Sequence, residues 1–299
     1  MCLSVKEAVK TYKNGCKSKC NAATEIIVGK SILAGMMIGM GAAASSVAAH
    51  NIENVGLARL AAAVVFPVGL MMVILLGAEL FTGDCLAVIG LPEKDVTILQ
   101  FIRLLALVYV GNLFGGVILS WLVSFSGQLD YTNGMLGAYT IKVALGKAAI
   151  TPVKAVTSGI LCNILVCAAV LMALCAKDVA GKLLVSFFVI MLFVVAGFEH
   201  CVANMYYITA GLIAKMNPDY VERAVEYFGV TGAQLEVLNL KNMIFNNLIP
   251  VTVGNIIGGA CFVGLPLYYL NREKVSVNKT KEESDNGKYA GTYVRGIAR

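Results

Sequence analysis

Two polar interruptions of long apolar runs decide how this chain folds. The first, Gly77-Ala78-Glu79-Leu80-Phe81-Thr82-Gly83-Asp84, lies inside an apolar run over residues 57–90. The second, Gly197-Phe198-Glu199-His200, lies inside a run over residues 183–214. Each run is too long, and too polar in its middle, to be one continuous membrane helix of about 20 residues. Both runs therefore predict a broken helix with charged residues at the break.

The composition is that of a membrane protein. The 299 residues are 58% hydrophobic and 14% charged, with a mean hydropathy of +0.77, whereas soluble domains carry about a quarter charged residues. Four further apolar runs, over residues 26–49, 101–125, 153–176 and 243–270, bring the expected spans to six. We therefore expect an all-α membrane protein that forms one bundle in the lipid bilayer, without an appended soluble domain.

Lysine and arginine predict the orientation of the bundle. Six spans put both termini on the same side of the membrane, and that side then holds 17 of the 24 Lys and Arg residues. Because cytoplasmic loops carry the excess of these residues, both termini are expected in the cytoplasm. The cations gather at the termini and form no stripe with interleaved aromatic residues, so we expect no nucleic-acid partner.

The polar segments outside the spans divide the chain. Residues 1–25 predict a cytoplasmic amphipathic helix, because Val5, Ala8, Val9 and Tyr12 recur at helical spacing between lysines. From the residues alone this helix serves at least as an interfacial anchor. The remaining expectations are an outer loop over residues 127–152, short helices covering the outer mouth over 217–242, and a polar cytoplasmic tail over 271–299.

A repeated motif relates the two halves of the chain. Gly111-Asn112-Leu113-Phe114-Gly115-Gly116 in the third span recurs as Gly254-Asn255-Ile256-Ile257-Gly258-Gly259 in the sixth. Repeats three spans apart have opposite orientations in the membrane, so residues 26–126 and 153–270 predict an inverted repeat. The glycines of the motif are expected to let helices pack closely. In such repeats the two breaks face each other near the bilayer midplane, which places the functional site there.

The polar residues at the breaks need partners or a water-filled cavity, since a charge at the centre of a membrane helix costs about 2.5–3.5 kcal/mol. This applies to Glu79, Asp84, Glu199 and His200. The imidazole of His200 either hydrogen-bonds within the packing or faces a pore, where it donates a hydrogen bond or a proton. Thr82 on the opposite break offers a hydroxyl. The glutamates are expected to cap backbone amides or to pair with a lysine.

Other residues near the breaks permit two interpretations. Lys147, just before the fourth span, either extends to the membrane interface or faces the pathway, and Asn163 lies within that span. Bulky apolar side chains near the breaks are either ordinary core or constrictions of a pore, and periodicity does not decide between these. These side chains are Phe66, Leu70, Leu80, Phe81 and Phe193.

Both break motifs resemble the signatures of the formate/nitrite transporter family. The resemblance includes Phe198-Glu199-His200-Cys201-Val202-Ala203-Asn204-Met205, the paired Gly-Asn-x-x-Gly-Gly and Asn217-Pro218-Asp219-Tyr220, and it extends from Lys6 to about Tyr269. It implies an aquaporin-like protomer with six spans in an inverted repeat, assembled as a homopentamer in the bacterial inner membrane. Each protomer would then have its own pore for small monovalent anions.

The resemblance also implies roles for individual residues. His200 matches the central histidine of the family, and Thr82 matches the threonine that faces it. The N-terminal helix resembles a segment proposed to gate the inner mouth with pH, and Cys201 stands where many members have serine. The remaining matches are Lys147, Asn163 and Glu199 around the central chamber, Leu70, Leu80 and Phe81 at the inner constriction, and Phe66 and Phe193 at the outer one.

The functional expectation is a channel for small monovalent anions. The whole-chain resemblance is closest to hydrosulfide channels, which implies HS⁻ export linked to sulfite reduction, with formate and nitrite as further permeants. The alternative is a proton-coupled formate/nitrite transporter in which His200 lends a proton to the anion. An enzyme is excluded because two histidines cannot build a multi-His metal or haem site, so we expect no metal or cofactor. A water or glycerol channel is excluded because the breaks lack paired Asn-Pro-Ala turns.

Overall fold

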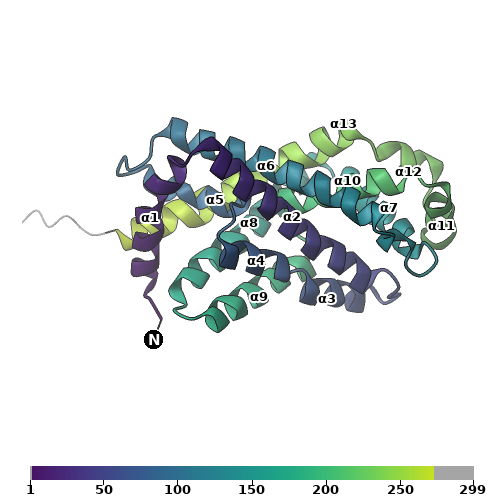
Figure 1. Cartoon of the computed structure of the whole chain (residues 1–299), viewed down its shortest axis with the longest axis horizontal. Coiled ribbons are helices and arrows are strands. Elements are labelled where there is room, and N and C mark those ends of the chain that lie inside the picture. Colours follow the sequence, from purple (N-terminus) through teal and green to yellow (C-terminus); the bar gives the residue numbers. More distant parts are fainter. Residues whose placement is uncertain (1, 273–299) are drawn as a thin grey trace, which may run out of the picture.

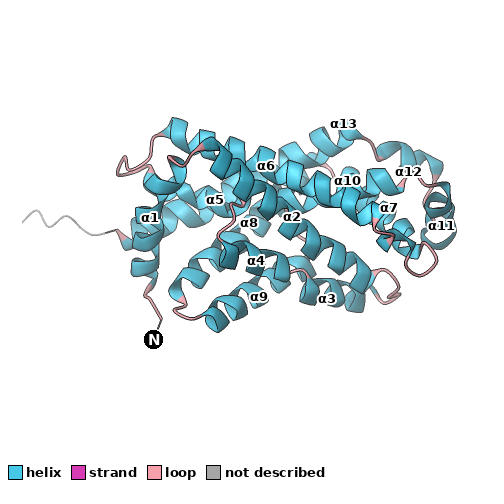
Figure 2. Cartoon of the chain, in the orientation of Figure 1, coloured by secondary structure: helices cyan, strands magenta, loops and turns pink. Residues whose placement is uncertain are grey.

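The computed structural model describes residues 2–272, and in that range the chain consists of helices and their connections (Figures 1 and 2). Within these residues six helical segments are long and apolar enough to cross a membrane, as expected. These segments are Thr24–Ala49, Val55–Leu76, Ile98–Phe125, Pro152–Cys175, Val179–Ala196 and Leu240–Asn271. The expected tail, residues 271–299, lies outside the described residues beyond Arg272.

The helices follow in chain order. They are α1 (Val5–Cys20), α2 (Thr24–Ala49), α3 (Val55–Val65), α4 (Val68–Leu76), α5 (Phe81–Asp84), η1 (Cys85–Gly90), α6 (Ile98–Phe125), η2 (Gln128–Asp130), α7 (Met135–Ala148), α8 (Pro152–Cys175), α9 (Val179–Ala196), α10 (Cys201–Ala214), α11 (Pro218–Phe228), α12 (Gly232–Val237), α13 (Leu240–Asn242), η3 (Met243–Leu248), α14 (Ile249–Ile256), η4 (Ile257–Gly264) and α15 (Leu265–Asn271).

Glycines of the repeated motif bring pairs of helices into direct backbone contact. Helix α2 packs along α6 in the first half, and α8 packs along α14 and η4 in the second. A Cβ atom on Gly115 would lie 2.1 Å from the carbonyl oxygen of Ile32, and one on Gly258 would lie 2.3 Å from that of Ile160. Any side chain at these positions would force the helices apart, so the expected packing role of the glycines is confirmed.

Both broken spans are interrupted in the same way. Helix α4 ends at Gly77, with φ of 65°, and α9 ends at Gly197, with φ of 75°. This left-handed conformation is cheap only for glycine, and it turns the chain out of the helix. In both spans a new helix begins after three more residues. These helices are α5, which begins at Phe81, and α10, which begins at Cys201. The two expected breaks are thereby confirmed.

The segment 127–152, expected as an outer loop, contains helix α7 instead. This helix buries Leu136, Ile141 and Leu145 and packs against α10 and α11. Its 14 residues are too few to cross a membrane, which is why hydropathy alone assigned the segment to a loop. Helix α7 ends next to Lys147, so it fixes where that side chain lies.

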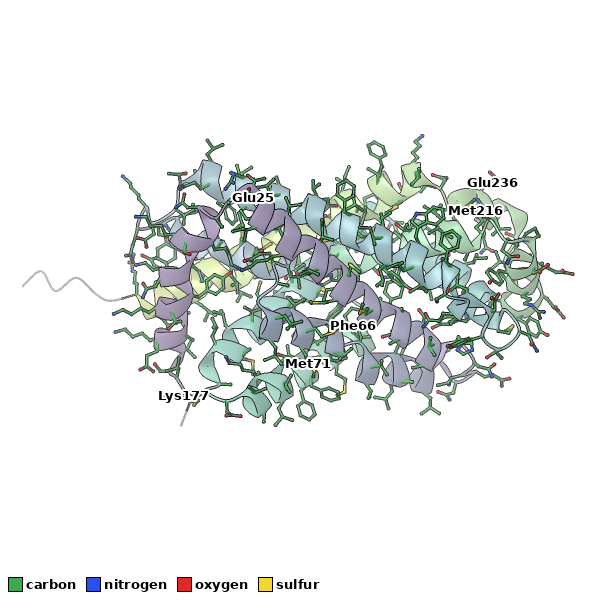
Figure 3. The ribbon with its side chains drawn as sticks, in the orientation of Figure 1. Glu25, Phe66, Met71, Lys177, Met216 and Glu236 are labelled. Atoms are coloured by element: carbon green, nitrogen blue, oxygen red, sulfur yellow. The ribbon has the colours of Figure 1, made fainter. Side chains whose placement is uncertain are left out.

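The two ends of the molecule carry different helices. Figure 1 shows α1 at one end of the long axis and α11 and α12 at the other. Helix α1 lies within residues 1–25, and α11, α12 and α13 lie within residues 217–242, the two segments for which helices are expected. Helix α1 buries Ala8, Val9 and Cys16 against the bundle. In Figure 3, Phe66 lies midway along this axis, between Lys177 at the α1 end and Glu236 at the opposite end.

Candidate functional site

The two breaks meet at the centre of the molecule. The Nε2 atom of His200 lies 3.0 Å from the Oγ1 atom of Thr82, 118 residues earlier in the chain. Both side chains are buried, with exposed fractions of 3% and 0%. The inverted repeat predicts a functional site where the two breaks face each other, and Thr82 and His200 meet at that place.

Helix α10 determines the protonation pattern of His200. The residue caps this helix, and its Nδ1 atom accepts a hydrogen bond of 3.2 Å from the backbone N–H of Ala203. A backbone N–H can only donate, so Nδ1 carries no proton. The proton of the neutral ring must then be on Nε2, and this N–H donates to the Thr82 hydroxyl oxygen. His200 thus presents a donor to the centre of the molecule.

The asparagines of the repeated motif fasten the two breaks. Asn112 donates from Nδ2 to the Glu79 carbonyl (3.0 Å) and accepts at Oδ1 from the Phe81 N–H (2.9 Å). Asn255 does the same in the second half, donating to the Glu199 carbonyl (3.1 Å) and accepting from the Cys201 N–H (3.0 Å). Each asparagine satisfies backbone groups that a broken helix leaves without partners. In each half one residue lies between the carbonyl and the N–H that the asparagine binds. This residue is Leu80 in the first half and His200 in the second.

Asn163 supports the centre without lining it. Its Nδ2 donates to the Thr82 carbonyl (3.1 Å) and to the Asn255 carbonyl (2.6 Å). The Cys167 thiol donates to the same Thr82 carbonyl (3.3 Å). These bonds hold the backbone of Thr82, so Asn163 positions the threonine.

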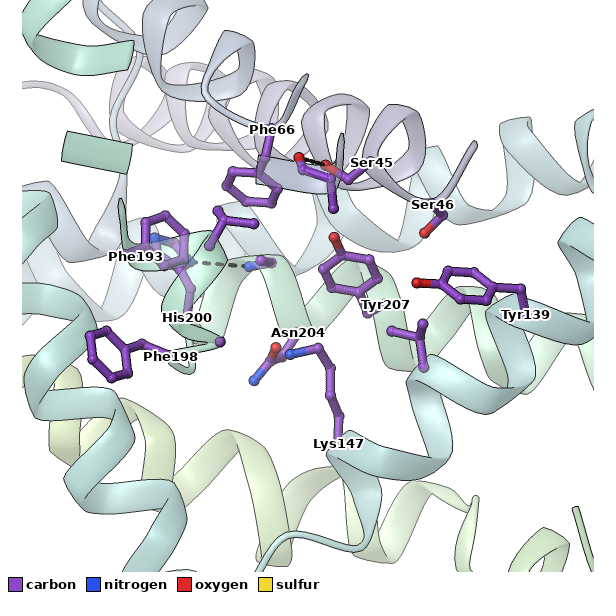
Figure 4. A pocket seen from close by; sticks show the side chains of 15 residues that line it. Ser45, Ser46, Phe66, Tyr139, Lys147, Phe193, Phe198, His200, Asn204 and Tyr207 are labelled. Carbon is purple, nitrogen blue, oxygen red and sulfur yellow. Dashed lines mark hydrogen bonds between the residues drawn. The ribbon is translucent and has the colours of Figure 1, made fainter. Parts of the chain in front are cut away.

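A vestibule of about 150 Å³ opens on one side of His200 (Figure 4). We call it the Lys147 vestibule, because Lys147 lies on its wall with Asn204 and the two tyrosines Tyr139 and Tyr207. In Figure 4 the rings of Phe66 and Phe193 lie beside His200 at one end, and Lys147 and Tyr139 lie toward the other. The rings of Phe66 and Phe193 meet edge to face with 5.5 Å between centroids.

A second vestibule of about 300 Å³ lies on the opposite side of the centre, under α1. This α1 vestibule is lined by Tyr12 and Lys19 from α1 and by Glu79, Leu80 and Asp84 from the first break, together with Leu70, Val73, Ile74, Gly77, Ala78, Gly83, Val170, Ala173, Leu174 and Lys182. The Tyr12 hydroxyl donates to the Gly83 carbonyl (3.2 Å). Helix α1 thereby closes over the first break.

A chamber of only about 10 Å³ lies between the two vestibules. Phe66, Phe193 and His200 line both this chamber and the Lys147 vestibule, whereas Leu70 and Leu80 line both the chamber and the α1 vestibule. The two phenylalanines therefore form one apolar partition and the two leucines the other. A chamber of this size holds about one water molecule, so the passage is closed in this conformation.

Phe81 does not belong to the inner partition, which corrects the expectation for this residue. Its ring packs edge to face on Tyr109, with 5.1 Å between centroids. It lines a separate apolar groove between α6 and α14, with Tyr109 and Thr252 among its neighbours. Leu80 and Phe81 are consecutive residues at the start of a helix, so their side chains point in different directions.

Lys147, on the wall of the Lys147 vestibule, forms an ion pair with Glu199, which does not itself line the vestibule. The Nζ atom lies 3.1 and 3.2 Å from the two carboxylate oxygens. Asn204 (2.5 Å) and Asn247 (3.4 Å) also donate to Oε2 of Glu199. The ammonium lies 5.2 Å from the centroid of the Tyr207 ring. The lysine partner expected for this glutamate is confirmed, and the pair is electrically neutral overall.

The first break has a different charge arrangement. Lys19 of α1 lies 2.5 Å from Oδ1 of Asp84 and 2.6 Å from Oε2 of Glu79. The second contact is an ion pair without hydrogen-bond geometry. Burial on its own lowers the pKa of the Lys19 ammonium, but Asp84, Tyr12 and Glu79 raise it well above its usual value. One lysine thus serves two carboxylates.

Sequence reasoning missed several residues of this site. The sequence pattern places Tyr12 and Lys19 only in an interfacial helix, because their contacts at the first break lie at least 60 positions away in the chain. Asn112 and Asn255 belong to the motif that predicts close helix packing, and that motif alone does not indicate their hydrogen-bond partners. A signal was present, since an asparagine at the same place in two apolar helices must find hydrogen-bond partners.

Comparison with known proteins agrees with this geometry. The sequence profile described as formate/nitrite transporter matches residues 6–269. The chain is 40% identical over 219 residues to the formate channel FocA of Haemophilus influenzae, covering 73% of this chain and 76% of that protein. It is 35% identical over 257 residues to a probable formate transporter of Methanothermobacter thermautotrophicus, covering 80% and 86%.

A solved structure has the same fold. It is described as a pentameric formate channel with formate bound, and it superposes with a TM-score of 0.75 at 33% identity. The match covers 83% of this chain and 97% of that one. From the profile match, the relatives and this fold, we conclude that the chain belongs to the formate/nitrite transporter family.

Proposed function

We propose that this member of the family is a passive channel for small monovalent anions in which His200 acts as a fixed hydrogen-bond donor. The observation that carries the proposal is the bond from the Ala203 N–H to Nδ1 of His200 (3.2 Å). This bond leaves Nε2–H directed at Thr82 (3.0 Å). An anion that enters the chamber takes over this N–H, and the Thr82 hydroxyl turns its own proton toward the anion.

The electrostatics favour an anion at the centre more than at the vestibule walls. Lys147 is neutralised by Glu199, and Lys19 faces Glu79 and Asp84. The N-terminal end of α10 lies at His200, and its dipole is positive there. The contact between the Ala203 N–H and Nδ1 transmits this polarity through the imidazole to Nε2–H. The driving interaction is thus a polarised donor in a site with little water.

The apolar partitions restrict what can pass. The chamber of about 10 Å³ has room for about one water molecule, so the rings of Phe66 and Phe193 and the side chains of Leu70 and Leu80 must move before an anion crosses. Constrictions of this kind gate by excluding water. Compact anions with few heavy atoms therefore cross most easily.

Formate is the permeant that we propose first, because the similar proteins carry formate in their names. Hydrosulfide export is the narrower proposal from the sequence. One observation supports it, since HS⁻ has one heavy atom and the closed chamber holds about one water molecule. Nitrite, with three heavy atoms, should behave as formate does.

The test is stopped-flow light scattering of proteoliposomes under equal gradients of formate, nitrite, hydrosulfide and chloride. The measurement is made at alkaline pH, where hydrosulfide predominates over the membrane-permeant neutral acid, and empty liposomes report the background. We expect formate, nitrite and hydrosulfide to exceed chloride. A rate for hydrosulfide well above that of formate would identify hydrosulfide as the preferred ion. Equal rates for all four anions would contradict selection by the chamber.

The alternative is a proton-coupled weak-acid transporter in which His200 lends its proton. Lending requires the imidazolium form, with protons on both ring nitrogens. The Nδ1 proton would then face the Ala203 N–H, so this form requires the cap of α10 to open. Clamping the membrane potential with potassium and valinomycin separates the two mechanisms. Formate flux through a passive channel changes several-fold with potential, whereas electroneutral coupled flux does not.

The assembly of the protein is proposed from its similarity to a solved structure. A similar structure is described as pentameric, and we propose a homopentamer in the bacterial inner membrane, with both termini in the cytoplasm. Chemical cross-linking and the mass of the purified complex test this assembly.

We also propose that α1, held by Tyr12 and Lys19, gates the α1 vestibule. Deleting residues 1–19 should then abolish closure at low pH, and closure that persisted would contradict the gate.

A further inference from the structure

The segment before α1 is tied to the end of α8. The backbone N–H of Leu3 donates a hydrogen bond of 2.8 Å to the carbonyl of Cys175, which is the last residue of α8. A carbonyl in the last turn of a helix has no partner within that helix, so Leu3 satisfies a group that α8 leaves free. This bond joins a segment outside the six spans to the end of the fourth span.

The same bond brings two cysteines together. Cys2 precedes Leu3 and Cys175 provides the carbonyl, so the Cα atoms of the two cysteines are at most about 8 Å apart. Their side chains are also close enough to interact electrostatically. A disulfide joins Cα atoms that lie about 4.4–6.8 Å apart. Cys2 lies before the first residue of α1, so its backbone can make the small approach that a disulfide needs while the helix stays intact.

Both thiols of this pair are accessible. Cys2 is exposed and Cys175 is half-buried. Of the other seven cysteines six are buried, and Cys261 is exposed on η4 within the last span. Buried cysteines are inert because an oxidant does not reach them. Among the residues that the structure describes, Cys2 and Cys175 are therefore the neighbouring thiols that an oxidant can reach from the water.

The surroundings of this pair are polar. Lys177 and Asp178 follow closely after Cys175 in the chain. Lys177 interacts electrostatically with Glu7 in the first turn of α1. Figure 3 shows Lys177 at the same end of the molecule as α1. The pair thus lies at the polar edge of the bundle, where a small water-soluble oxidant can approach it.

We propose that Cys2 and Cys175 are a redox site, at which the two thiols form a reversible disulfide when hydrogen peroxide reaches them. The Cys2 thiolate attacks the peroxide, whose O–O bond breaks, and the products are a sulfenic acid and hydroxide. The Cys175 thiolate then attacks the sulfenic sulfur, so that an S–S bond forms, the S–O bond breaks and a second hydroxide leaves. The two thiol protons convert both hydroxide ions to water. In total the two thiols lose two electrons, and the peroxide is reduced to two water molecules.

The disulfide acts on the passage through α1. It fixes the segment before this helix to α8, and the helix itself contacts the first break through Tyr12 and Lys19. A cross-link therefore restricts any movement of α1 away from the α1 vestibule. On the cytoplasmic side, where we propose that the termini lie, thiols are kept reduced, so the cross-link forms only when the peroxide concentration rises. This consequence rests on the proposed function, whereas the disulfide itself does not.

The experiment treats the full-length protein in detergent with hydrogen peroxide, blocks the remaining thiols with N-ethylmaleimide and maps disulfides by mass spectrometry without reduction. We expect linked peptides containing Cys2 and Cys175 in the wild type, and their loss in Cys2→Ser, in Cys175→Ser and after dithiothreitol. The control Cys261→Ser removes the other exposed thiol and should keep the linked peptides. Peroxide that oxidises Cys2 without linking it to Cys175 would overturn the proposal. Cross-linked protomers on a non-reducing gel, formed through Cys2, would also overturn it.

A second arm measures the consequence for transport in proteoliposomes. Oxidised wild-type protein should pass formate at least about threefold more slowly than the same protein reduced with dithiothreitol, because α1 is restrained. Cys2→Ser should give equal rates in both states. Linked peptides without any change in flux would overturn the coupling to α1. An absence of flux in the reduced wild type would contradict the channel function and not the disulfide, which the peptide map measures independently.

Discussion

The two breaks share one scaffold but differ in chemistry. In both, a left-handed glycine ends the first helix, a glutamate follows and pairs with a lysine, and a motif asparagine fastens the backbone. The next position is Leu80 in the first half and His200 in the second. The inverted repeat therefore builds a symmetric frame, and the donor stands on one side of it only.

The lysines also differ in where they come from. Lys147 comes from α7 and serves one carboxylate, whereas Lys19 comes from α1 and serves two. The pair at Lys147 is complete within the bundle. The pair at the first break depends on a helix outside the six spans, which makes that side the more easily altered. The two breaks thus share the backbone arrangement held by the asparagines, whereas the lysines that pair with their carboxylates come from different parts of the fold.

The largest effect is expected from breaking the frame itself. Asn255→Leu leaves the Glu199 carbonyl and the Cys201 N–H without partners, at a cost of about 1–3 kcal/mol each. Asn112→Leu leaves the equivalent groups of the first half without partners. Both variants should therefore lower the thermal unfolding midpoint in detergent, and by similar amounts. Asn246→Leu, at a partly buried position with one long bond of 3.5 Å, is the control. Very different midpoints for the two motif variants would refute the symmetry of the frame.

The next effect concerns the neutral pair. Lys147→Gln leaves Glu199 charged without its ammonium, and breaking a buried pair typically costs about 3–5 kcal/mol. The side chains are 17% and 11% exposed, so we expect the lower end of this range. The double variant Lys147→Gln/Glu199→Gln should recover most of the stability in thermal unfolding. No recovery in the double variant would mean that charge pairing is not what Lys147 contributes.

A smaller effect is expected at the position that breaks the symmetry. His200→Asn retains an N–H donor, so its electrogenic formate flux should stay within about tenfold of the wild-type rate, equivalent to about 1.4 kcal/mol. His200→Leu makes the second half match Leu80 and removes the donor, so it should lose more flux than His200→Asn. Stopped-flow rates of both variants measure this difference. Abolished flux in His200→Asn would instead support the proton-lending alternative.

The smallest effect lies at the edge of α1. Lys13 and Tyr268 lower the pKa of Glu93, so the charged carboxylate contributes stability above its usual pKa and loses it as the pH falls through the lowered value. Glu93 is 47% exposed, so Glu93→Gln should cost less than about 1 kcal/mol at pH 7. Unfolding midpoints measured at successive pH values should converge with wild type below about pH 4. A constant difference across that range would show that charge is not responsible, and Glu25→Gln serves as control.

The sequence was sufficient to locate the spans and the centre of the site. Long apolar runs measure membrane thickness directly, and a charge inside such a run is costly, so Thr82 and His200 could be found from the polar breaks. The inverted repeat then followed from the odd number of spans between the two motifs. These inferences use only local patterns and the membrane.

The remaining features depend on packing that local patterns do not contain. Helix α7 was read as a loop because its apolar residues cover fewer turns than a membrane span needs. The direction of the Phe81 ring is set by the residue at which α5 begins, one position after Leu80. Lys19 meets Asp84 across 65 positions of sequence. A single sequence does not specify such contacts.

The cap on His200 has a consequence for the energy balance of the cell. A proton relay through an imidazole requires the ring to accept a proton on one nitrogen, release it from the other and then turn over. Here the Ala203 N–H occupies Nδ1, so the ring is held in one orientation and cannot turn without opening the cap of α10. The imidazole of His200 therefore does not relay protons through the centre of the passage while the cap is closed. Under the proposed channel function, a cell membrane containing this protein would pass anions and still keep its proton gradient.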